Sequence, residues 1–257
     1  MMLLANKNAV ITGGSDGIGL GIAESFAEHG ANLILIGRDI EKLKKAKAEA
    51  SWHGTSVHII TSDLSDVNTI KALSAEILTI FPKVDILVNN AGVGKFTPFQ
   101  ETDLSLFDQH LNLNVKAPYL LTQALLPSLI ETKGNIINIS SYFAHRMLYG
   151  RTTTAYSLTK GAINSFTKSL AFEIGHLGVR VNAIAPGSVQ TPQFERNLHS
   201  LTDDGQKAFH SMIKNIYPLG KIGTIEDIGK SAVFLASDQA SWVTGAIFAI
   251  DGGLTTN

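Results

Sequence analysis

The sequence predicts a single α/β domain in which one doubly wound parallel sheet of about seven strands carries helices on both faces. Three observations support this prediction. Short apolar runs rich in Val and Ile recur along the whole chain, and longer amphipathic stretches separate them. Runs that are apolar on both faces are typical of strands buried in a parallel sheet. No Pro/Gly/Ser-rich linker, charge block or repeat divides the 257 residues, which suit one large domain.

The expected strands and helices alternate in chain order. The apolar runs predict strands at Asn8–Thr12, Asn32–Ile36, Val57–Thr61, Val84–Val88, Asn135–Ser140, Val179–Ala183 and Ala246–Ile250. Amphipathic stretches predict helices at Ile18–His29, Asp39–Ala50 and Thr224–Ala236, and a further helix carries Tyr156 and runs through Ala171. Active sites of such sheets lie beyond the carboxyl ends of the strands, so the residues that follow each run are the candidates for chemistry.

Composition and charge exclude several classes of protein. Hydrophobic residues make up 44% of the chain and charged residues 17%, which permits a large core and argues against disorder. The formal net charge of −1 gives no reason to expect a nucleic-acid partner. Because the chain has no cysteine, it forms no disulfide, thiolate metal site or cysteine nucleophile.

No targeting or membrane segment is expected. Met1 to Lys7 show no basic region followed by a long apolar run, and no apolar run reaches the roughly 20 residues that span a bilayer. We therefore expect a cytoplasmic protein without a membrane partner. The histidines have no metal-ligand spacing, so no metal site is predicted.

The first expected strand leads into a glycine-rich turn and then a helix. Glycines allow backbone N–H groups to approach an anion, and the helix N-terminus adds partial positive charge. The turn therefore favours a cradle for the pyrophosphate of a dinucleotide, although a plain strand-to-helix turn has the same composition. The candidate contacts are Gly13, Ser15, Asp16, Ile18 and Gly19.

The second expected strand ends at Gly37-Arg38-Asp39, where dinucleotide folds meet the adenosine ribose. An acidic residue there binds the 2′-hydroxyl of NAD, whereas an arginine suits the 2′-phosphate of NADP. Arg38 favours NADP(H), and NAD(H) stays possible because Asp39 could be a hydroxyl ligand and Asp16 places a negative charge nearby. Arg38 could equally be a solvated residue at the start of a helix.

Tyr156 and Lys160 lie four residues apart on an expected helix, so their side chains share a face. A tyrosine titrates near ~10, too high for easy proton exchange at neutral pH. A nearby ammonium lowers that pKa, and a general acid or base works best near the operating pH. The pair alone is common on helix surfaces. Polar residues also follow three other strands, at Ser62-Asp63-Leu64, Asn89–Gly92 and Ser140-Ser141.

Several motifs occur in order, each after an apolar run. They are Thr12-Gly-x3-Gly-Ile-Gly19, Asp63, Asn89-Asn-Ala-Gly92, Ser141, Tyr156-x3-Lys160 and Pro186-Gly187. This set resembles the classical short-chain dehydrogenase/reductase family, and its 3-oxoacyl-carrier-protein reductases among others. The resemblance covers nearly the whole chain, including a closing segment that ends at Asp251-Gly-Gly253. It implies a Rossmann-like fold and an NAD(P)-dependent oxidoreductase.

The resemblance implies a role for each catalytic candidate. Tyr156 gives a proton to a ketone or takes one from an alcohol, and Lys160 lowers its pKa and holds the nicotinamide ribose. Ser141 hydrogen-bonds the carbonyl oxygen as charge develops on it. Asn114 positions a water that links Lys160 to solvent, or it hydrogen-bonds a carbonyl within its own helix. The neighbouring rivals are Asn112 and Ser140.

The resemblance also implies contacts with the rest of the cofactor. Asp63 and Leu64 contact the adenine, and the segment that covers the nicotinamide runs from Pro186 to Thr191 and includes Gly187 and Val189. The adenosine ribose side is lined by Asn90, Ala91 and Gly92.

The segment between Ser141 and Tyr156 departs from the family pattern. The two residues are 156 − 141 = 15 positions apart, about two more than expected for the family, so Tyr142–Thr154 is interpreted as a longer loop beside the substrate. We expect either substrate contact or solvent exposure for three residues of this loop, namely His145, Arg146 and Tyr149.

The substrate pocket is expected between Val93–Phe99, Tyr142–Tyr149 and a mobile helical lid at residues 188–217. Four phenylalanines are candidates for an apolar wall: Phe96, Phe99, Phe143 and Phe194. The predicted partner is a small-molecule carbonyl or alcohol, such as a 3-oxoacyl thioester, a ketone, a sugar or a polyol. The alternative function is a non-catalytic dinucleotide sensor or scaffold. By resemblance the protein is a homotetramer, joined through the two long helices and the C-terminal strand region.

Overall fold

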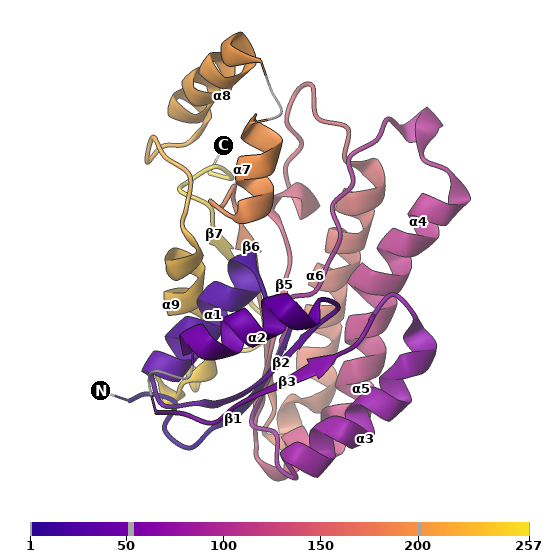
Figure 1. Cartoon of the computed structure of the whole chain (residues 1–257), viewed down its shortest axis with the longest axis vertical. Helices are drawn as coiled ribbons and strands as arrows, with labels where there is room; N and C mark the ends of the chain where they lie inside the picture. Colours follow the sequence, from indigo (N-terminus) through magenta and orange to yellow (C-terminus); the bar gives the residue numbers. More distant parts are fainter. Residues whose placement is uncertain (1, 51–53, 200–201, 257) are drawn as a thin grey trace.

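The computed structural model describes residues 2–50, 54–199 and 202–256 (Figure 1). These residues form a seven-stranded parallel sheet with the order β3-β2-β1-β4-β5-β6-β7. The strands are β1 (Asn8–Thr12), β2 (Asn32–Gly37), β3 (Val57–Thr61), β4 (Ile86–Asn89), β5 (Asn135–Ile139), β6 (Arg180–Pro186) and β7 (Ile247–Ile250). The predicted doubly wound α/β fold is confirmed. The strand order reverses between β1 and β4, which places a ligand crevice at their carboxyl ends.

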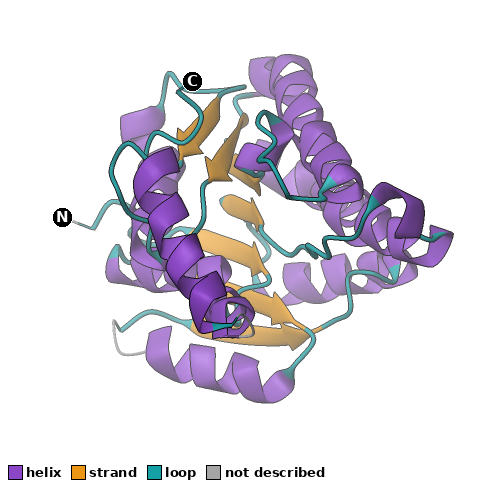
Figure 2. Cartoon of the chain, turned by 90° about the horizontal axis from the view of Figure 1, so that it is seen from above, coloured by secondary structure: helices purple, strands orange, loops and turns teal. Residues whose placement is uncertain are grey.

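Helices cover both faces of the sheet (Figure 2). One face packs against α1 (Gly17–Glu28), α2 (Ile40–Ala50) and α9 (Ile225–Ala236). The other packs against α3 (Ile70–Ile80), α5 (Ala117–Glu131) and α6 (Thr154–Ile174), with α4 (Leu104–Leu111) beside α6. Successive strand residues alternate between these two cores: Val10 and Ile34 face the second, whereas Ile11 and Leu35 face the first.

A close helix contact organises the first face. A Cβ atom at Gly229 of α9 would lie 2.5 Å from the carbonyl oxygen of Gly21 in α1, and one at Gly21 would lie 2.6 Å from the Ile225 side chain. The glycines therefore let the two helix backbones approach more closely than larger residues permit. This packing fixes the direction of α1, whose N-terminus begins at the glycine-rich turn.

Five strands differ from their predicted bounds, and β4 and β6 differ by more than one residue at one end. β4 begins at Ile86 rather than Val84, because the Val84 N–H donates to Ser128 Oγ and the Val84 carbonyl accepts from Thr132 Oγ1. β6 continues to Pro186, three residues beyond the predicted end at Ala183, because its pairing with β7 extends to Ile250.

Two helices stand at the carboxyl end of the sheet, α7 (Pro192–His199) and α8 (Asp203–Ile216), at the top of Figure 1. They fall within the predicted lid at 188–217, of which residues 200 and 201 lie outside the described part of the chain. Ile213 and Tyr217 pack with Tyr142, Phe143 and Leu254 in a small separate core. Among the described residues, no helix is long and apolar enough to cross a membrane.

Candidate active site

The catalytic candidates meet beyond the carboxyl end of β5. Ser141 follows β5 directly and is 6% exposed, while Tyr156 and Lys160 lie one turn apart on α6. The Ser141 side chain lies close enough to the Tyr156 hydroxyl to lower the pKa of that hydroxyl. Ser140, the rival candidate, instead donates from Oγ to Asn164 Oδ1 at 2.6 Å. The geometry therefore favours Ser141 as the serine that acts with Tyr156.

The environment of Tyr156 differs from the one that the sequence predicted. Burial raises the pKa of Tyr156 to about 12, and the nearby Ser141 side chain offsets only part of that rise. The net shift of this pKa is therefore upward, opposite to the predicted lowering. The Nζ atom of Lys160 lies 5.6 Å from the centre of the Tyr156 ring and donates instead to the Ile139 carbonyl at 2.7 Å.

Lys160 is a buried cation without a carboxylate partner among the described residues. Its side chain is 5% exposed, and burial lowers its pKa to about 8 because water solvates the ammonium poorly there. A Cβ atom at Gly92, in the loop after β4, would lie 3.7 Å from Nζ. The ammonium therefore lies between the ends of β4 and β5, on the side of the Tyr156 ring.

Asn114 lies in a π-helical segment, Asn112–Lys116, that joins α4 to α5. Its Oδ1 accepts from the Val93 N–H at 2.8 Å, and its Nδ2 donates to the Val93 carbonyl at 2.9 Å and to Thr159 Oγ1 at 3.1 Å. The side chain thus contacts the loop after β4 and not a carbonyl of its own helix. Asn112, the rival candidate, only accepts from Lys116 at the surface.

A groove of about 430 Å³ runs along the carboxyl ends of β1, β2 and β4. Eleven of the predicted cofactor contacts line it: Gly13, Ser15, Asp16, Ile18, Arg38, Asp63, Leu64, Asn90, Ala91, Gly92 and Thr191. Gly187 and Val189 line the adjoining pocket, whereas Gly19 and Pro186 line neither. Gly17 of the glycine-rich turn and Ser62 also line the groove, as do two residues that the sequence reasoning missed, Lys42 and Leu113.

The glycine turn and the loop after β4 interlock. Gly13 has a φ of +63°, and a Cβ atom there would lie 2.8 Å from Asn90 Nδ2. Asn90 Nδ2 donates to the carbonyls of Thr12 and Gly13 at 2.9 and 3.1 Å. A Cβ atom at Gly19 would overlap the Gly13 carbonyl oxygen. Only glycine fits at both positions, and the open backbone fits the close approach of a pyrophosphate.

The charged residues near the carboxyl end of β2 favour the binding of an additional phosphate group. Asp16 pairs with Lys42 Nζ at 2.7 Å, so its negative charge is balanced. The Asp39 carboxylate accepts from the first N–H groups of α2, through Glu41 and Lys42, and caps that helix. Arg38 is exposed in the groove, and its positive charge contributes to the pKa shift of the Asp63 carboxyl. Burial acts to raise the pKa of Asp63, but hydrogen bonds with Ser65 and the Arg38 charge lower it overall.

The adjoining pocket, of about 370 Å³, has Ser141 and Tyr156 in its wall. The rings of Phe96 and Phe143 pack on Tyr156, at 5.4 and 6.2 Å between centroids, and Phe194 also lines the pocket. Phe99 does not, since it is 76% exposed.

The long loop between Ser141 and Tyr156 contributes one charged residue to this pocket. His145, Arg146 and Tyr149, the predicted candidates, do not line it; His145 contacts Asn164 at 3.1 Å and Tyr149 is fully exposed. Arg151, which the sequence reasoning passed over, does line it. Its position three residues before the helix that carries Tyr156 was the only signal in the sequence.

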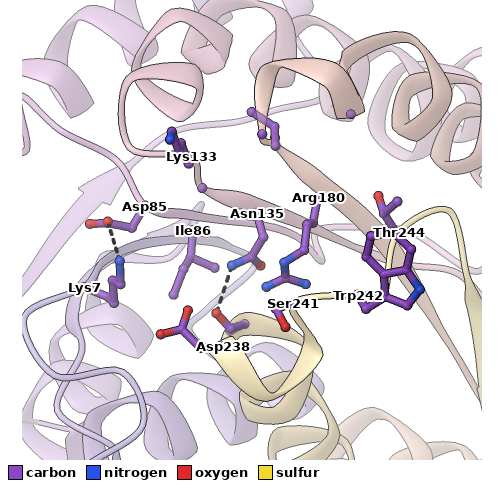
Figure 3. Close-up of a pocket in the computed structure, with 15 residues that line it drawn as sticks. Lys7, Asp85, Ile86, Lys133, Asn135, Arg180, Asp238, Ser241, Trp242 and Thr244 are labelled. Atoms are coloured by element: carbon purple, nitrogen blue, oxygen red, sulfur yellow. Dashed lines mark hydrogen bonds and ion pairs between the residues drawn. The ribbon is translucent and has the colours of Figure 1, made fainter.

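A separate hollow of about 450 Å³ lies at the opposite, amino-terminal edge of the sheet (Figure 3). Its polar groups join strand starts to other segments: Lys7 pairs with Asp85 at 3.2 Å, and Asn135 Nδ2 donates to the Ala236 carbonyl at 3.0 Å. Arg180 donates to two backbone carbonyls. No catalytic candidate lines this hollow. Among the described residues there is no group of three or more His, Cys, Asp or Glu that could hold a metal.

A groove suited to a dinucleotide, beside a pocket that holds a serine and a tyrosine, with a buried lysine next to the tyrosine, is the site of an NAD(P)-dependent oxidoreductase. Comparison with known proteins gives the family. A family model described as enoyl-(acyl carrier protein) reductase matches residues 13–255. The chain therefore belongs to the short-chain dehydrogenase/reductase family, as the sequence motifs predicted.

Individual relatives agree over the full length of the chain. It is 41% identical to oxidoreductase UcpA of Salmonella typhimurium, over 98% of this chain and 95% of that protein. It is 35% identical to 3-oxoacyl-[acyl-carrier-protein] reductase FabG of Chlamydia muridarum, over 98% of each chain. The crystal structure of L-sorbose reductase from Gluconobacter frateurii, complexed with NADPH and L-sorbose, superposes with a TM-score of 0.94 at 30% identity, over 100% of this chain and 99% of that one.

Proposed function

We propose that the protein catalyses the reversible, NADP-dependent interconversion of a carbonyl and an alcohol on a small molecule. The observation that carries this proposal is the placement of Ser141 and Tyr156 together in the wall of a pocket that adjoins the dinucleotide groove. Lys160 lies beside this pair as a buried cation. Together the three residues supply the acid, the polar contact and the positive charge that carbonyl reduction uses.

The proposed mechanism follows from the positions of these residues. In the direction of reduction, Tyr156 transfers its phenolic proton to the substrate oxygen, and Ser141 donates a hydrogen bond to that oxygen as negative charge develops. The reduced nicotinamide, when bound, supplies the hydride to the carbonyl carbon, so one C–H and one O–H bond replace the carbonyl π bond. The Lys160 ammonium stabilises the phenolate that remains. In the direction of oxidation, the phenolate takes the proton back from the alcohol.

Two further roles complete the proposed catalytic group. Lys160 holds the nicotinamide ribose, and Asn114 positions a water that connects Lys160 to solvent. The contacts of Asn114 with Val93 and Thr159 support this placement, because they hold the end of the β4 loop and the helix of Lys160 in one arrangement.

NADP(H) is the proposed cofactor, with NAD(H) as the weaker alternative. The turn from Gly13 to Gly19 holds the pyrophosphate, and Asp63 and Leu64 contact the adenine. The adenosine ribose side is lined by Asn90, Ala91 and Gly92, and Pro186 to Thr191 cover the nicotinamide. Exposed Arg38 and the Asp16–Lys42 pair support a bound 2′-phosphate, as does the NADPH bound to the L-sorbose reductase.

The substrate and organisation are proposed on similar grounds. The FabG relative acts on 3-oxoacyl chains by its name, and the L-sorbose reductase binds a sugar; the modest pocket of about 370 Å³ supports the smaller substrate. We infer one domain over residues 1–257 with a lid at residues 188–217, a cytoplasmic location and a homotetramer.

The test is a panel of carbonyls and alcohols assayed with both cofactors. Tyr156→Phe removes the proton donor and leaves the ring in place, so we expect the rate to fall by about 10²- to 10⁴-fold. Tyr149→Phe is the matched control, because Tyr149 is fully exposed outside the pocket, and its rate should equal that of the wild type. Equal rates for wild type and Tyr156→Phe would overturn the catalytic assignment of Tyr156, and absence of turnover in the wild type would support the non-catalytic sensor.

A further inference from the structure

Arg151 gives the substrate pocket its charge. Its side chain lines the pocket together with Ser141 and Tyr156. Among the described residues that line this pocket, it is the only one with a charged side chain. The residue is exposed, so the charge lies at the opening of the pocket and not in its depth.

The guanidinium of Arg151 has no hydrogen-bond or ion-pair partner among the described residues; only its backbone N–H is bonded, to the Leu148 carbonyl at 3.1 Å. Arg180, by contrast, donates to two backbone carbonyls, and Lys7 pairs with Asp85. Arginine donors that are not used by the protein are available to a ligand, and their fork matches a carboxylate or a phosphate.

The charge of Arg151 acts on the interior of the pocket. Burial raises the pKa of the Tyr142 hydroxyl well above its usual value, and the nearby Tyr217 adds to that rise, while Arg151 works in the opposite direction. Tyr142 lines the same pocket. The guanidinium is therefore close enough to stabilise a negative charge placed beside the Tyr142 hydroxyl.

The wall next to Arg151 is polar. Tyr217 donates from its hydroxyl to Ser188 Oγ at 2.8 Å and accepts from the Ser188 N–H at 2.9 Å, and Tyr142 is also hydrogen-bonded to Ser188. The pocket also has apolar rings, since Phe96 and Phe143 pack on Tyr156 and Phe143 stacks on Tyr142 at 4.0 Å between centroids. A substrate in this pocket therefore meets apolar rings together with hydroxyl groups and a cation.

We propose that Arg151 binds an anionic group of the substrate, so that the enzyme acts on small oxo acids and hydroxy acids. This inference rests on the proposed carbonyl–alcohol activity. The carboxylate pairs with the guanidinium at the pocket opening, while the reacting carbonyl lies against Ser141 and Tyr156. A phosphate ester offers the same anionic chemistry, and the test below separates the two sources.

The test compares each acid with a neutral partner of similar shape. Oxo acids of different chain length are assayed beside their primary amides, and sugar phosphates beside the free sugars. For wild type, we expect kcat/KM to be about 10- to 100-fold higher for the anionic member of each pair. The difference should lie in KM, and it should become smaller when salt is added. Preference for acids over phosphates identifies the carboxylate as the source, and the reverse identifies the phosphate.

Arg151→Gln should remove this preference by raising KM for the anionic compounds. It should change kcat little, and it should leave kcat/KM for the neutral compounds nearly unchanged. Arg151→Lys keeps the charge without the fork, so it should restore part of the preference. Lys71→Gln is the matched control, because it removes one exposed positive charge from α3, away from the pocket lining, and it should behave as wild type. Thermal unfolding confirms that each variant is folded.

The proposal is overturned if the wild type has the same kcat/KM for acids, phosphates and their neutral partners. It is also overturned if Arg151→Gln lowers kcat/KM equally for all of these compounds. Absence of turnover with every compound would be a failure of the proposed function. In that case, calorimetric binding of the same oxo acids to wild type and Arg151→Gln still decides the role of Arg151, since equal affinities would contradict it.

Discussion

The Asn114 side chain is hydrogen-bonded to both backbone polar groups of Val93, with Oδ1 2.8 Å from the amide nitrogen and Nδ2 2.9 Å from the carbonyl oxygen. Asn114 is 1% exposed, and its Nδ2 also donates to Thr159 Oγ1. One amide therefore joins the π-helical segment, the loop after β4 and α6, which carries Tyr156 and Lys160.

Asn114→Ala should lower the free energy of unfolding by about 2–4 kcal/mol, because it leaves two buried backbone groups of Val93 without partners. It should also lower kcat, since the loop after β4 loses its attachment to α6. Urea unfolding measures the first effect. Asn112→Ala is the control, because Asn112 bonds only Lys116 at the surface, and it should cost less than about 0.5 kcal/mol. Similar losses for the two variants would contradict this account of Asn114.

The lowered pKa of Lys160 predicts how the reaction depends on pH. Lys160 loses its proton near pH 8, and the neutral amine no longer stabilises the phenolate that forms when Tyr156 gives up its proton. Carbonyl reduction should therefore slow as the pH rises through about 8. The measurement is kcat from about pH 6 to about pH 10 with saturating reduced cofactor.

Two variants test whether Lys160 causes this decline. Lys160→Arg keeps a positive charge at every pH, so any activity it retains should decline only at higher pH. Lys168→Met removes an exposed lysine from the same helix and should leave the profile unchanged. A rate that stays constant to about pH 10 in the wild type would exclude Lys160 from this role.

The same lysine gives a stability effect of defined sign. Its pKa is lower in the folded chain than its ordinary value of 10.5, so burial of the charge destabilises the fold below pH 8. That penalty is relieved as the pH rises from about 8 toward the unfolded pKa.

Local pattern was enough to predict most of the fold. Alternation of apolar runs and amphipathic stretches located every strand of the sheet, with β1 and β3 at the predicted bounds. The start of β4 was wrong because Val84 is held by Ser128 and Thr132, which lie 44 and 48 residues later in the chain. No pattern within a short window of sequence contains such a contact.

The site was predicted less completely, and for a related reason. The spacing of Tyr156 and Lys160 placed them on one helix face, but spacing carries no information about burial, which sets the direction of both pKa shifts. Lys42 was missed because its pairing with Asp16 joins residues 26 positions apart. Arg151 was missed because an arginine in a loop resembles any solvated residue.

Gly19→Ala should abolish binding of the dinucleotide. The added Cβ atom would overlap the Gly13 carbonyl oxygen and lie 2.5 Å from Asn90 Nδ2, so the turn has to open. We expect the affinity for NADPH, measured by fluorescence titration, to fall by more than about tenfold. Gly161→Ala is the control, since nothing lies within 4 Å of a Cβ atom there; it should keep the affinity and raise the free energy of unfolding by up to about 1 kcal/mol. Unchanged NADPH affinity in Gly19→Ala would show that the turn does not hold the cofactor.

Arg38→Ala should change the cofactor preference. Loss of the guanidinium should weaken NADPH binding by about 10- to 100-fold and leave NADH binding nearly unchanged, because only NADPH carries the 2′-phosphate. Lys42→Ala frees the Asp16 carboxylate from its ion pair and should also weaken NADPH binding through repulsion. Calorimetric titration of the wild type and both variants with NADPH and NADH measures these affinities. Tighter binding of NADH than of NADPH by the wild type would refute the assignment of Arg38.

The exposed aromatic residues of the long helices predict how the subunits assemble. Phe172 on α6 is 93% exposed and Tyr119 on α5 is 52% exposed, while Trp242, just before β7, is 99% exposed. Large apolar side chains exposed in this way are typical of protein–protein contacts. We expect a homotetramer at micromolar concentration, measured by light scattering.

Single substitutions should separate the two interfaces of this tetramer. Phe172→Asp buries a charge between the long helices and Trp242→Asp does so beside β7, so each variant should give dimers, and the double variant should give monomers. Tyr149→Asp adds the same charge to an exposed loop residue and should leave the tetramer intact. Because each dimer retains a different interface, chemical cross-linking should give different products for the two single variants. A monomeric wild type would refute the predicted tetramer. A Phe172→Asp variant that stays tetrameric would show that the long helices do not form an interface.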